Sequence, residues 1–153
     1  MKRSAGILLY RLREGALEVL LVHPGGPFWA RKDAAAWSIP KGGIEADEAP
    51  VDAARREFRE ELGFEAPQAL VELAAVRQAS GKTVQAWAAE GDWDPAGLAS
   101  LVFEMEWPPR SGRMQSYPEV DRAEWFSLEA ARGKLVAGQV PLLDALQNLV
   151  SGR

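Results

Sequence analysis

The order of the predicted elements indicates an α+β fold with a sandwich-like layout. Strand-like segments dominate the chain, one amphipathic helix follows the third of them, and the other helices are predicted near the C-terminal end. This order is unlike the strict strand–helix alternation of a parallel α/β protein. The length of 153 residues suits one well-packed core, so we expect a single domain over residues 1–153.

A β-hairpin is predicted at the start of the chain, because two apolar runs flank the turn Glu14-Gly15. The loop that follows is rich in glycine, proline, aromatic and cationic residues, and a short strand then leads into Pro40. The predicted elements of this half are strands over 4–12, 17–22 and 37–39, a loop over 24–36 and a helix over 50–62.

A second hairpin is predicted in the other half of the chain, with its turn at Ser80-Gly81. In a later run Phe103, Met105 and Trp107 alternate with other residues, as they would on one face of a strand. Ser127 is expected to cap the helix after the last strand. The predicted elements are strands over 71–78, 83–90, 101–107 and 122–126, a loop over 108–118, and helices that begin at 128 and cover 141–150.

The helix over residues 50–62 has clear boundary signals. Pro50 suits the first helical turn, and Asp47 is expected to cap the helix start. Gly63 stands just beyond the last turn, where a left-handed residue ends many helices. Four apolar side chains share a face that we expect to pack on the core: Val51, Ala54, Phe58 and Leu62.

Three carboxylates lie on the neighbouring face of this helix, near its end. At about 100° per residue, Glu57, Glu60 and Glu61 fall within an arc of about 100°. Like charges at this spacing weaken a helix by about 0.2–0.5 kcal/mol per pair, and their position opposes the helix dipole. A bound divalent cation would offset this repulsion. Because ligands that are all oxygen select hard cations, we expect Mg²⁺, with Mn²⁺ as the alternative.

The segment from residue 42 to 64 resembles the signature of the Nudix hydrolase family, G-x5-E-x7-R-E-U-x-E-E-x-G-U, in which U is a bulky apolar residue. Every fixed position is filled, by Gly42, Glu48, Arg56, Glu57, Phe58, Glu60, Glu61, Gly63 and Phe64. Phe58 departs mildly, because an aliphatic side chain is more usual there. The resemblance implies the family's fold over essentially the whole chain, an α/β/α sandwich with a mixed sheet between helices.

The resemblance also implies roles for the signature residues. Glu57, Glu60 and Glu61 correspond to the metal-binding carboxylates, and one of them can also accept a proton from the attacking water. The backbone carbonyl near Gly42 is implied as a further metal ligand. We expect Glu48 and Arg56 to form an ion pair that holds the preceding loop on the helix.

A further carboxylate is expected from a distant loop. Many members of the resembling family carry one shortly before a final strand with Glu-Trp, and here that pattern reads from Glu119 to Glu124-Trp125. Glu119 is therefore the candidate for a fourth ligand or the general base. The competing carboxylates are Glu104, Glu106 and Asp121, and the alternative for Glu119 is a solvated loop charge.

Substrate contacts are expected outside the signature helix. Lys41 and Lys82 lie in segments similar to those of diadenosine polyphosphate hydrolases, and each can meet a phosphate. Trp29 and Tyr117 are candidates to stack on a nucleobase, with Arg31 beside Trp29 as a cation. The alternatives are solvated loop charges and buried loop anchors.

Composition narrows the class of partner. The net charge of −4 argues against extended nucleic acid, which needs a basic face, and favours a small nucleotide whose phosphates meet a metal. The apolar runs are strand-sized, so no membrane span is predicted. The absence of cysteine fits a reducing compartment, and we expect a cytoplasmic monomer or homodimer. The single histidine, His23, ends an apolar run and is expected at the core edge or surface, and no nucleophile motif accompanies it as a catalytic triad would require.

We therefore expect a Mg²⁺-dependent pyrophosphohydrolase that uses water to cleave a phosphoanhydride bond of a nucleoside diphosphate linked to another moiety. Dinucleoside polyphosphates are the first candidates for substrate, and nucleoside triphosphates the second. The alternative from another class is a noncatalytic nucleotide-sensing module on the same fold. Such a module is expected to lack one or more signature glutamates, and all of them are present here.

Overall fold

A mixed six-stranded sheet forms the centre of the protein in a computed structural model that describes residues 2–152, so the two end residues of the predicted domain lie outside it. The strand order is β4-β5-β1-β2-β8, and β3 pairs with β1. β1 and β5 are parallel and the other pairs are antiparallel. The strands are β1 (Arg3–Arg13), β2 (Ala16–Pro24), β3 (Lys41–Gly43), β4 (Val71–Arg77), β5 (Thr83–Glu90) and β8 (Val120–Ser127).

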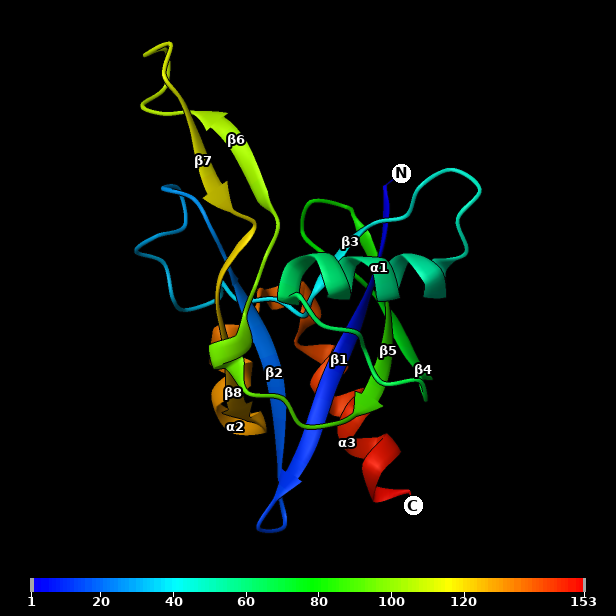
Figure 1. Ribbon diagram of the computed structural model, residues 1–153. Coiled ribbons are helices and arrows are strands. Elements are labelled where there is room, and N and C mark those ends of the chain that lie inside the picture. Colours follow the sequence, from blue (N-terminus) through cyan, green and yellow to red (C-terminus); the bar gives the residue numbers. More distant parts are fainter. Residues whose placement is uncertain (1, 153) are drawn as a thin grey trace.

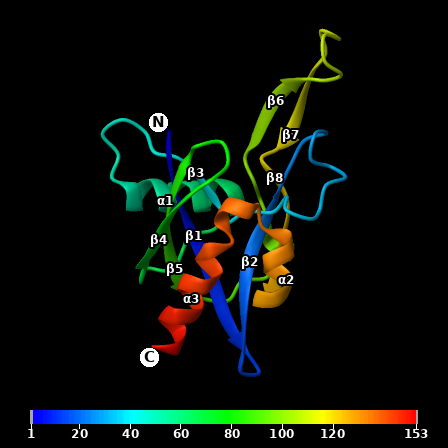
Figure 2. The same cartoon turned by 180° about the vertical axis from the view of Figure 1, so that it is seen from behind.

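Helices cover both faces of this sheet (Figures 1 and 2). α1 (Pro50–Leu62) crosses one face, and α2 (Leu128–Lys134) and α3 (Pro141–Ser151) cover the other. The predicted sandwich with a mixed sheet between helices is therefore confirmed. None of the helices within residues 2–152 is long and apolar enough to cross a membrane.

The alternating side chains of β1 fill both halves of the core. Ile7 and Leu9 pack with Phe58 on the α1 side, whereas Leu8 and Tyr10 pack on the side of α2 and α3. All of these side chains are almost completely buried. Because both faces of the strand are covered, its sequence is a continuous apolar run instead of an apolar–polar alternation.

α1 has the bounds that the sequence predicts, and Gly63 ends it in the left-handed conformation at φ 87°. The predicted cap at Asp47 is wrong, because Ala49 occupies the N-cap position and no side chain caps it. The loop before the helix is held differently. The carboxylate of Glu48 accepts a hydrogen bond from the backbone N–H of Glu45 and also binds Arg56. Glu48 therefore fastens the loop from the side of the helix.

Two other predictions for local structure need correction. Residues 108–118 do not form a loop throughout, because β7 (Met114–Pro118) pairs with β6 (Val102–Glu106) in a separate two-stranded sheet that projects from the body (Figure 1). β7 is largely exposed on both faces, so it carries no apolar alternation. The short strand predicted over 37–39 consists only of isolated bridges at Trp37 and Ser38, and the regular strand begins at Lys41.

Candidate active site

Three carboxylates converge beside the last turns of α1. Glu57 and Glu61 lie one helical turn apart, and Glu119 reaches them from the segment between β7 and β8. One oxygen of each lies within 4.8 Å of the others. The helical period therefore brings two of these groups together, and the tertiary fold adds the third.

Backbone hydrogen bonds hold Glu119 in this position. Its N–H donates to the carbonyl of Leu101 at 2.8 Å, and its own carbonyl accepts from Gly25 at 2.9 Å. The N–H of Leu101 donates in turn to the carbonyl of Glu60 at 2.9 Å. The segment that carries Glu119 is thus tied directly to the end of α1.

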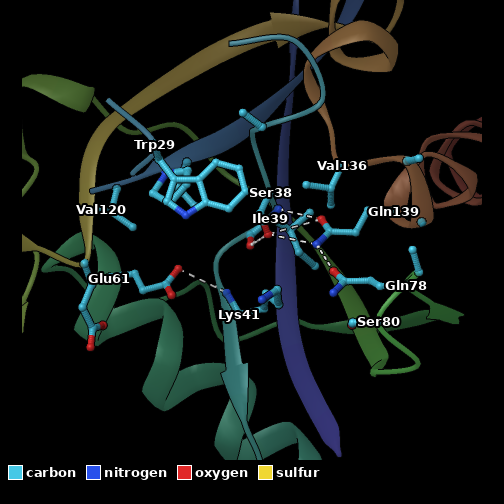
Figure 3. A pocket seen from close by; sticks show the side chains of 17 residues that line it. Trp29, Ser38, Ile39, Lys41, Glu61, Gln78, Ser80, Val120, Val136 and Gln139 are labelled. Atoms are coloured by element: carbon cyan, nitrogen blue, oxygen red, sulfur yellow. Dashed lines mark hydrogen bonds between the residues drawn. The ribbon is translucent and has the colours of Figure 1, made fainter. Parts of the chain in front are cut away.

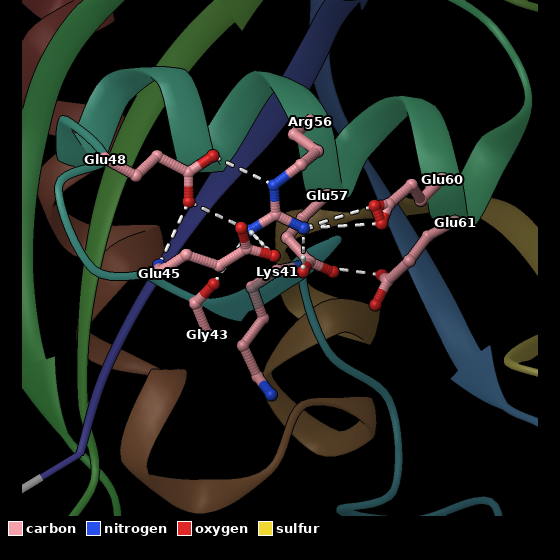
Figure 4. Close-up of polar contacts among 8 residues, drawn as sticks. All are labelled: Lys41, Gly43, Glu45, Glu48, Arg56, Glu57, Glu60 and Glu61. Carbon is pink, nitrogen blue, oxygen red and sulfur yellow. Dashed lines mark hydrogen bonds and ion pairs between the residues drawn. The ribbon is translucent and has the colours of Figure 1, made fainter.

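Arg56 binds three acidic residues of the signature segment, Glu48, Glu57 and Glu60 (Figure 4). Its guanidinium donates to Glu48 at 2.9 and 3.0 Å, to Glu57 at 2.8 Å and to Glu60 at 3.1 Å. It also donates to the carbonyl of Gly43 at 2.9 Å. The predicted Glu48–Arg56 ion pair is present, and it fixes the loop before α1 against the helix.

The two ends of this acidic row have opposite electrostatics. Arg56 holds the pKa of Glu48 at about 2, with help from the N–H of Glu45. Burial, with a smaller contribution from the charge of Glu57, raises the pKa of Glu61 to about 8 against the opposing effect of Lys41. Burial also raises the pKa of Glu57 and of Glu119. The pKa is therefore raised in all three carboxylates that converge, and burial is the main cause in each.

Lys41 borders this group from β3. Its backbone N–H donates to Glu61 at 3.2 Å. Burial lowers the pKa of its ammonium group and nearby Lys82 lowers it further, whereas Glu61 and Glu57 oppose the shift. A cation is therefore held next to the carboxylates, in a position where an anionic ligand would relieve its desolvation.

Gly42 allows β3 to approach α1 closely. A Cβ atom built at Gly42 would lie 2.0 Å from Cδ of Glu57, whereas one built at Gly43 would meet no atom within 4 Å. The side chain of Glu57 therefore occupies the space that any other residue at position 42 would fill. This explains the glycine by the geometry of the site.

The donor set fits a hard divalent cation. Glu57, Glu61 and Glu119 offer only oxygen atoms, and carboxylate oxygens are the ligands that Mg²⁺ and Mn²⁺ prefer. A cation would also compensate the charge that Lys41 leaves uncompensated. Glu60 lies outside this group of three and binds Arg56, although its charge contributes to the raised pKa of Glu119.

A cavity of about 600 Å³ opens beside Glu61 (Figure 3). Lys41, Glu61 and Glu119 form its polar border, and Trp29 forms part of its wall. Most of the remaining wall is apolar, from Val22, Pro24, Ala36, Ile39, Val120 and Val136. The cavity therefore joins the carboxylates to a space that suits an uncharged ring.

The structure brings together only some of the predicted substrate contacts. Lys41 and Trp29 line the cavity, and Lys82 lies close enough to Lys41 to lower the pKa of its ammonium. Arg31 lies in a different depression. Tyr117 lies on β7 against Phe103, and its hydroxyl donates to Gln115. Arg31 and Tyr117 thus remain outside the cavity wall in this conformation.

The residues that compete with Glu119 have other partners or lie elsewhere. Asp121 accepts a hydrogen bond from buried His23 at 2.8 Å if Nδ1 of that ring carries the proton. Glu106 accepts hydrogen bonds from the backbone of Arg110 and Gly112 and so closes the β6–β7 turn. Glu104 lies on β6. Of the four, only Glu119 belongs to the group of carboxylates that converge.

Sequence reasoning missed the polar residues at the far end of the cavity. Gln139 and Gln78 join there by a hydrogen bond of 2.9 Å, and Ser38 adjoins them. No motif surrounds these positions, and a single glutamine among apolar residues carries no spacing signal. Only the packing of segments far apart in the chain reveals them.

The fold and the site together define an α/β/α protein whose signature helix presents a carboxylate site suited to a divalent cation. The NUDIX domain model matches residues 1–146, and the chain belongs to this family. The sequence resemblance to the Nudix signature is therefore confirmed.

Individual relatives are similar over part or all of the chain. The RNA pyrophosphohydrolase of Hahella chejuensis is 42% identical over 59 residues, which are 37% of this chain and 35% of that protein. The match thus spans about a third of the relative. A C. elegans Ap4A hydrolase structure has a TM-score of 0.69 at 24% identity and covers 100% of both chains. The E. coli ORF135 protein has a TM-score of 0.58 at 27% identity, over 100% of this chain and 94% of that one.

Proposed function

We propose that this protein is a pyrophosphohydrolase that cleaves a phosphoanhydride bond of a nucleotide, with water as the nucleophile and Mg²⁺ as the cofactor. The observation that carries the proposal is the convergence of Glu57, Glu61 and Glu119 within 4.8 Å at the border of a cavity. The names of the relatives support the same chemistry, since they include an RNA pyrophosphohydrolase and an Ap4A hydrolase.

Glu57, Glu61 and Glu119 would hold the cation, with Glu60 and the carbonyl of Gly42 as further candidate ligands. A divalent cation in such a site neutralises phosphate oxygens and polarises the reacting phosphorus. Glu119 enters from a different segment than the helical carboxylates and is our candidate for the residue that accepts the proton from water. Arg56 holds Glu57 in place through the hydrogen bond of 2.8 Å.

Lys41 is the candidate phosphate contact, because burial and the nearness of Lys82 disfavour its charge when no anion is bound. Lys82 would meet the more distant phosphates of a longer chain. Trp29 would stack on a base in the cavity that the phosphates border. Arg31 and Tyr117 would contribute only after a movement of the loop or the hairpin that carries them.

The substrate that we propose first is a dinucleoside polyphosphate, followed by a nucleoside triphosphate. Both place several phosphates next to a base, and this arrangement matches an apolar cavity that borders Lys41, with Lys82 nearby. We place this reaction in the cytoplasm and expect a monomer or homodimer to carry it out.

Release of phosphate or pyrophosphate from a nucleotide panel, with and without Mg²⁺, tests the proposal. The native chain should turn over at least one nucleotide only with the cation. Glu57→Gln, Glu60→Gln, Glu61→Gln and Glu119→Gln should each lower the rate, whereas the exposed Glu65→Gln should match the native chain. Tight nucleotide binding without metal and without turnover would instead identify a sensing module.

A further inference from the structure

A buried amide network forms the end of the cavity opposite the carboxylates (Figure 3). Gln139 lies in the short 3₁₀ segment η2 (Ala137–Gln139), and its exposed fraction is 0%. A buried amide is costly unless its donors and acceptor are all satisfied. Gln139 meets this requirement through Ile39, Ser38 and Gln78.

The direction of every hydrogen bond in this network follows from one backbone group. The N–H of Ile39 can only donate, and it lies 2.9 Å from Oε1 of Gln139. The other end of the Gln139 amide must therefore be its NH₂ group. That group donates to Ser38 Oγ at 3.0 Å and to Gln78 Oε1 at 2.9 Å.

The orientation of the Gln78 amide is determined in turn. Because its oxygen must face the donating Nε2 of Gln139, its own NH₂ group points away from Gln139 and toward the cavity (Figure 3). Within residues 2–152, no side chain or backbone group accepts a hydrogen bond from this NH₂ group. The cavity therefore contains a directed donor whose partner must come from solvent or from a ligand.

Close packing keeps Gln78 in place. A Cβ atom at Gly138 would lie 2.7 Å from the Cα of Gln78 and 2.9 Å from the carbonyl of Arg77. The backbone N–H of Gln78 also donates to the carbonyl of Lys82 across the β4–β5 turn. The backbone of Gln78 thus lies against η2 and within the β4–β5 turn, and the hydrogen bond from Gln139 sets the position of its amide.

We propose that Gln78 determines base specificity by donating a hydrogen bond to an acceptor on the edge of a nucleobase in this cavity. This inference rests on the proposed function, because it assigns the cavity to the base of the nucleotide whose phosphates meet Lys41 and the carboxylates. Trp29 and the apolar wall would cover the faces of the ring. Whether the NH₂ group of Gln78 forms a hydrogen bond then depends on the acceptors at the edge of the ring.

The donor favours bases with neighbouring acceptors. Guanine presents O6 and N7, which are both acceptors, whereas adenine presents N7 beside a donating amino group. An adenine edge would accept from one N–H of Gln78 at N7 and place its amino group against the other, which would stay unpaired, whereas guanine can accept from both. We therefore infer a preference for guanine nucleotides over adenine nucleotides.

Replacement of the Gln78 donor by a hydrogen-bond acceptor tests this assignment. In Gln78→Glu one carboxylate oxygen still accepts from Gln139, but the atom that faces the cavity becomes an acceptor. We expect the native chain to hydrolyse GTP over ATP, and the guanosine dinucleoside tetraphosphate over its adenosine counterpart, with a ratio of kcat/KM of about tenfold or more. The ratio should invert in Gln78→Glu and approach one in Gln78→Met, which removes the donor without adding charge.

The control is Gln68→Glu, which adds the same charge at an exposed position outside the cavity. It should leave the ratio unchanged even if the added negative charge lowers both rates. Circular dichroism must match between variants, and Gln78→Met provides the test if Gln78→Glu does not fold. An equal ratio of rates in the native chain and in a folded Gln78 variant would overturn the proposal.

Calorimetric titration with GMP and AMP separates this inference from the proposed function, because it needs no turnover. Stronger binding of GMP that is lost in Gln78→Met supports base recognition even if no nucleotide is hydrolysed, and only the hydrolase proposal then fails. Hydrolysis by the native chain with equal binding of GMP and AMP leaves the hydrolase proposal intact and overturns the role of Gln78.

Discussion

Glu48 and Glu61 belong to the same signature segment, yet their environments drive them in opposite directions. Glu48 lies in the half that Arg56 organises, and the guanidinium holds its pKa at about 2. Glu61 lies in the half that faces the cavity, where burial raises its pKa to about 8. The negative charge of Glu48 is compensated by Arg56, whereas that of Glu61 is only partly compensated, by Lys41.

This difference separates the residues that build the site from those that we expect to act in it. A carboxylate whose charge is largely compensated by a guanidinium, as that of Glu48 is, can stabilise the loop without a ligand. Carboxylates that converge with incomplete compensation repel each other until a cation binds. The sequence motif contains both kinds of glutamate without distinguishing them, so mutations in each half should have different consequences.

The largest effect is expected from Glu61→Gln. Loss of one cation-binding carboxylate should lower kcat by about 10²- to 10³-fold, comparable to the loss of a preorganised catalytic group. Steady-state hydrolysis of the best nucleotide measures this loss, with Glu65→Gln as the control for an exposed carboxylate. Equal rates for Glu61→Gln and the native chain would show that Glu61 is not one of the carboxylates that bind the catalytic cation.

Arg56→Met should mainly lower the stability of the fold, because Arg56 holds several acidic residues of the signature segment. It leaves Glu48, Glu57 and Glu60 without their shared partner, which should lower the free energy of unfolding by about 3 kcal/mol. Urea unfolding measures the change. Arg59→Met removes the exposed pair with Glu65 and should change stability by less than about 0.5 kcal/mol. Similar losses in the two variants would contradict the special role of Arg56.

Gly42→Ala should lower activity with little loss of stability. The new methyl group would displace the carboxylate of Glu57, but this flexible side chain can move aside while the fold remains. We expect a decrease in kcat of about tenfold to a hundredfold, the range seen when groups that position metal ligands are lost. Gly43→Ala is the matched control, since a Cβ at that position meets no atom within 4 Å.

The smallest expected effect is the pH dependence of stability, which should differ in direction between Glu61 and Glu48. In the metal-free protein the raised pKa of Glu61 contributes stability that is present below about pH 4.5 and lost as pH rises through about 8. The lowered pKa of Glu48 contributes stability that is present above about pH 4.5 and lost as pH falls toward about 2. Thermal unfolding in the presence of a chelator measures both.

At pH 9, Glu61→Gln should raise the Tm of the metal-free protein by about 2–4 °C, because the amide does not carry the unfavourable buried charge. Glu48→Gln should lower the Tm at pH 7 and have no effect below pH 2. A Tm difference between native and Glu61→Gln proteins that is constant from pH 4 to pH 9 would show that Glu61 does not carry the raised pKa.

Local signals in the sequence predicted most of the sheet and all of α1. Apolar runs located the two hairpins of the central sheet, and Pro50 with Gly63 marked the ends of the helix. The β7 strand escaped prediction because both of its faces are exposed, so no apolar period distinguishes it from a loop. The Asp47 cap was wrong because the N-cap position falls two residues later, at Ala49, and Asp47 has a left-handed backbone conformation at φ 64°.

The sequence by itself determined the helical row of carboxylates, because residues three and four positions apart on a helix share a face whatever surrounds them. Only the tertiary structure decided which of these acids Arg56 compensates, and that Glu119 joins Glu57 and Glu61. It also placed Trp29 in the cavity wall and Arg31 outside it. In the same way, it oriented the Gln78 amide through the hydrogen bond from Gln139. These contacts depend on backbone hydrogen bonds and packing between distant segments, which leave no periodic trace in the chain.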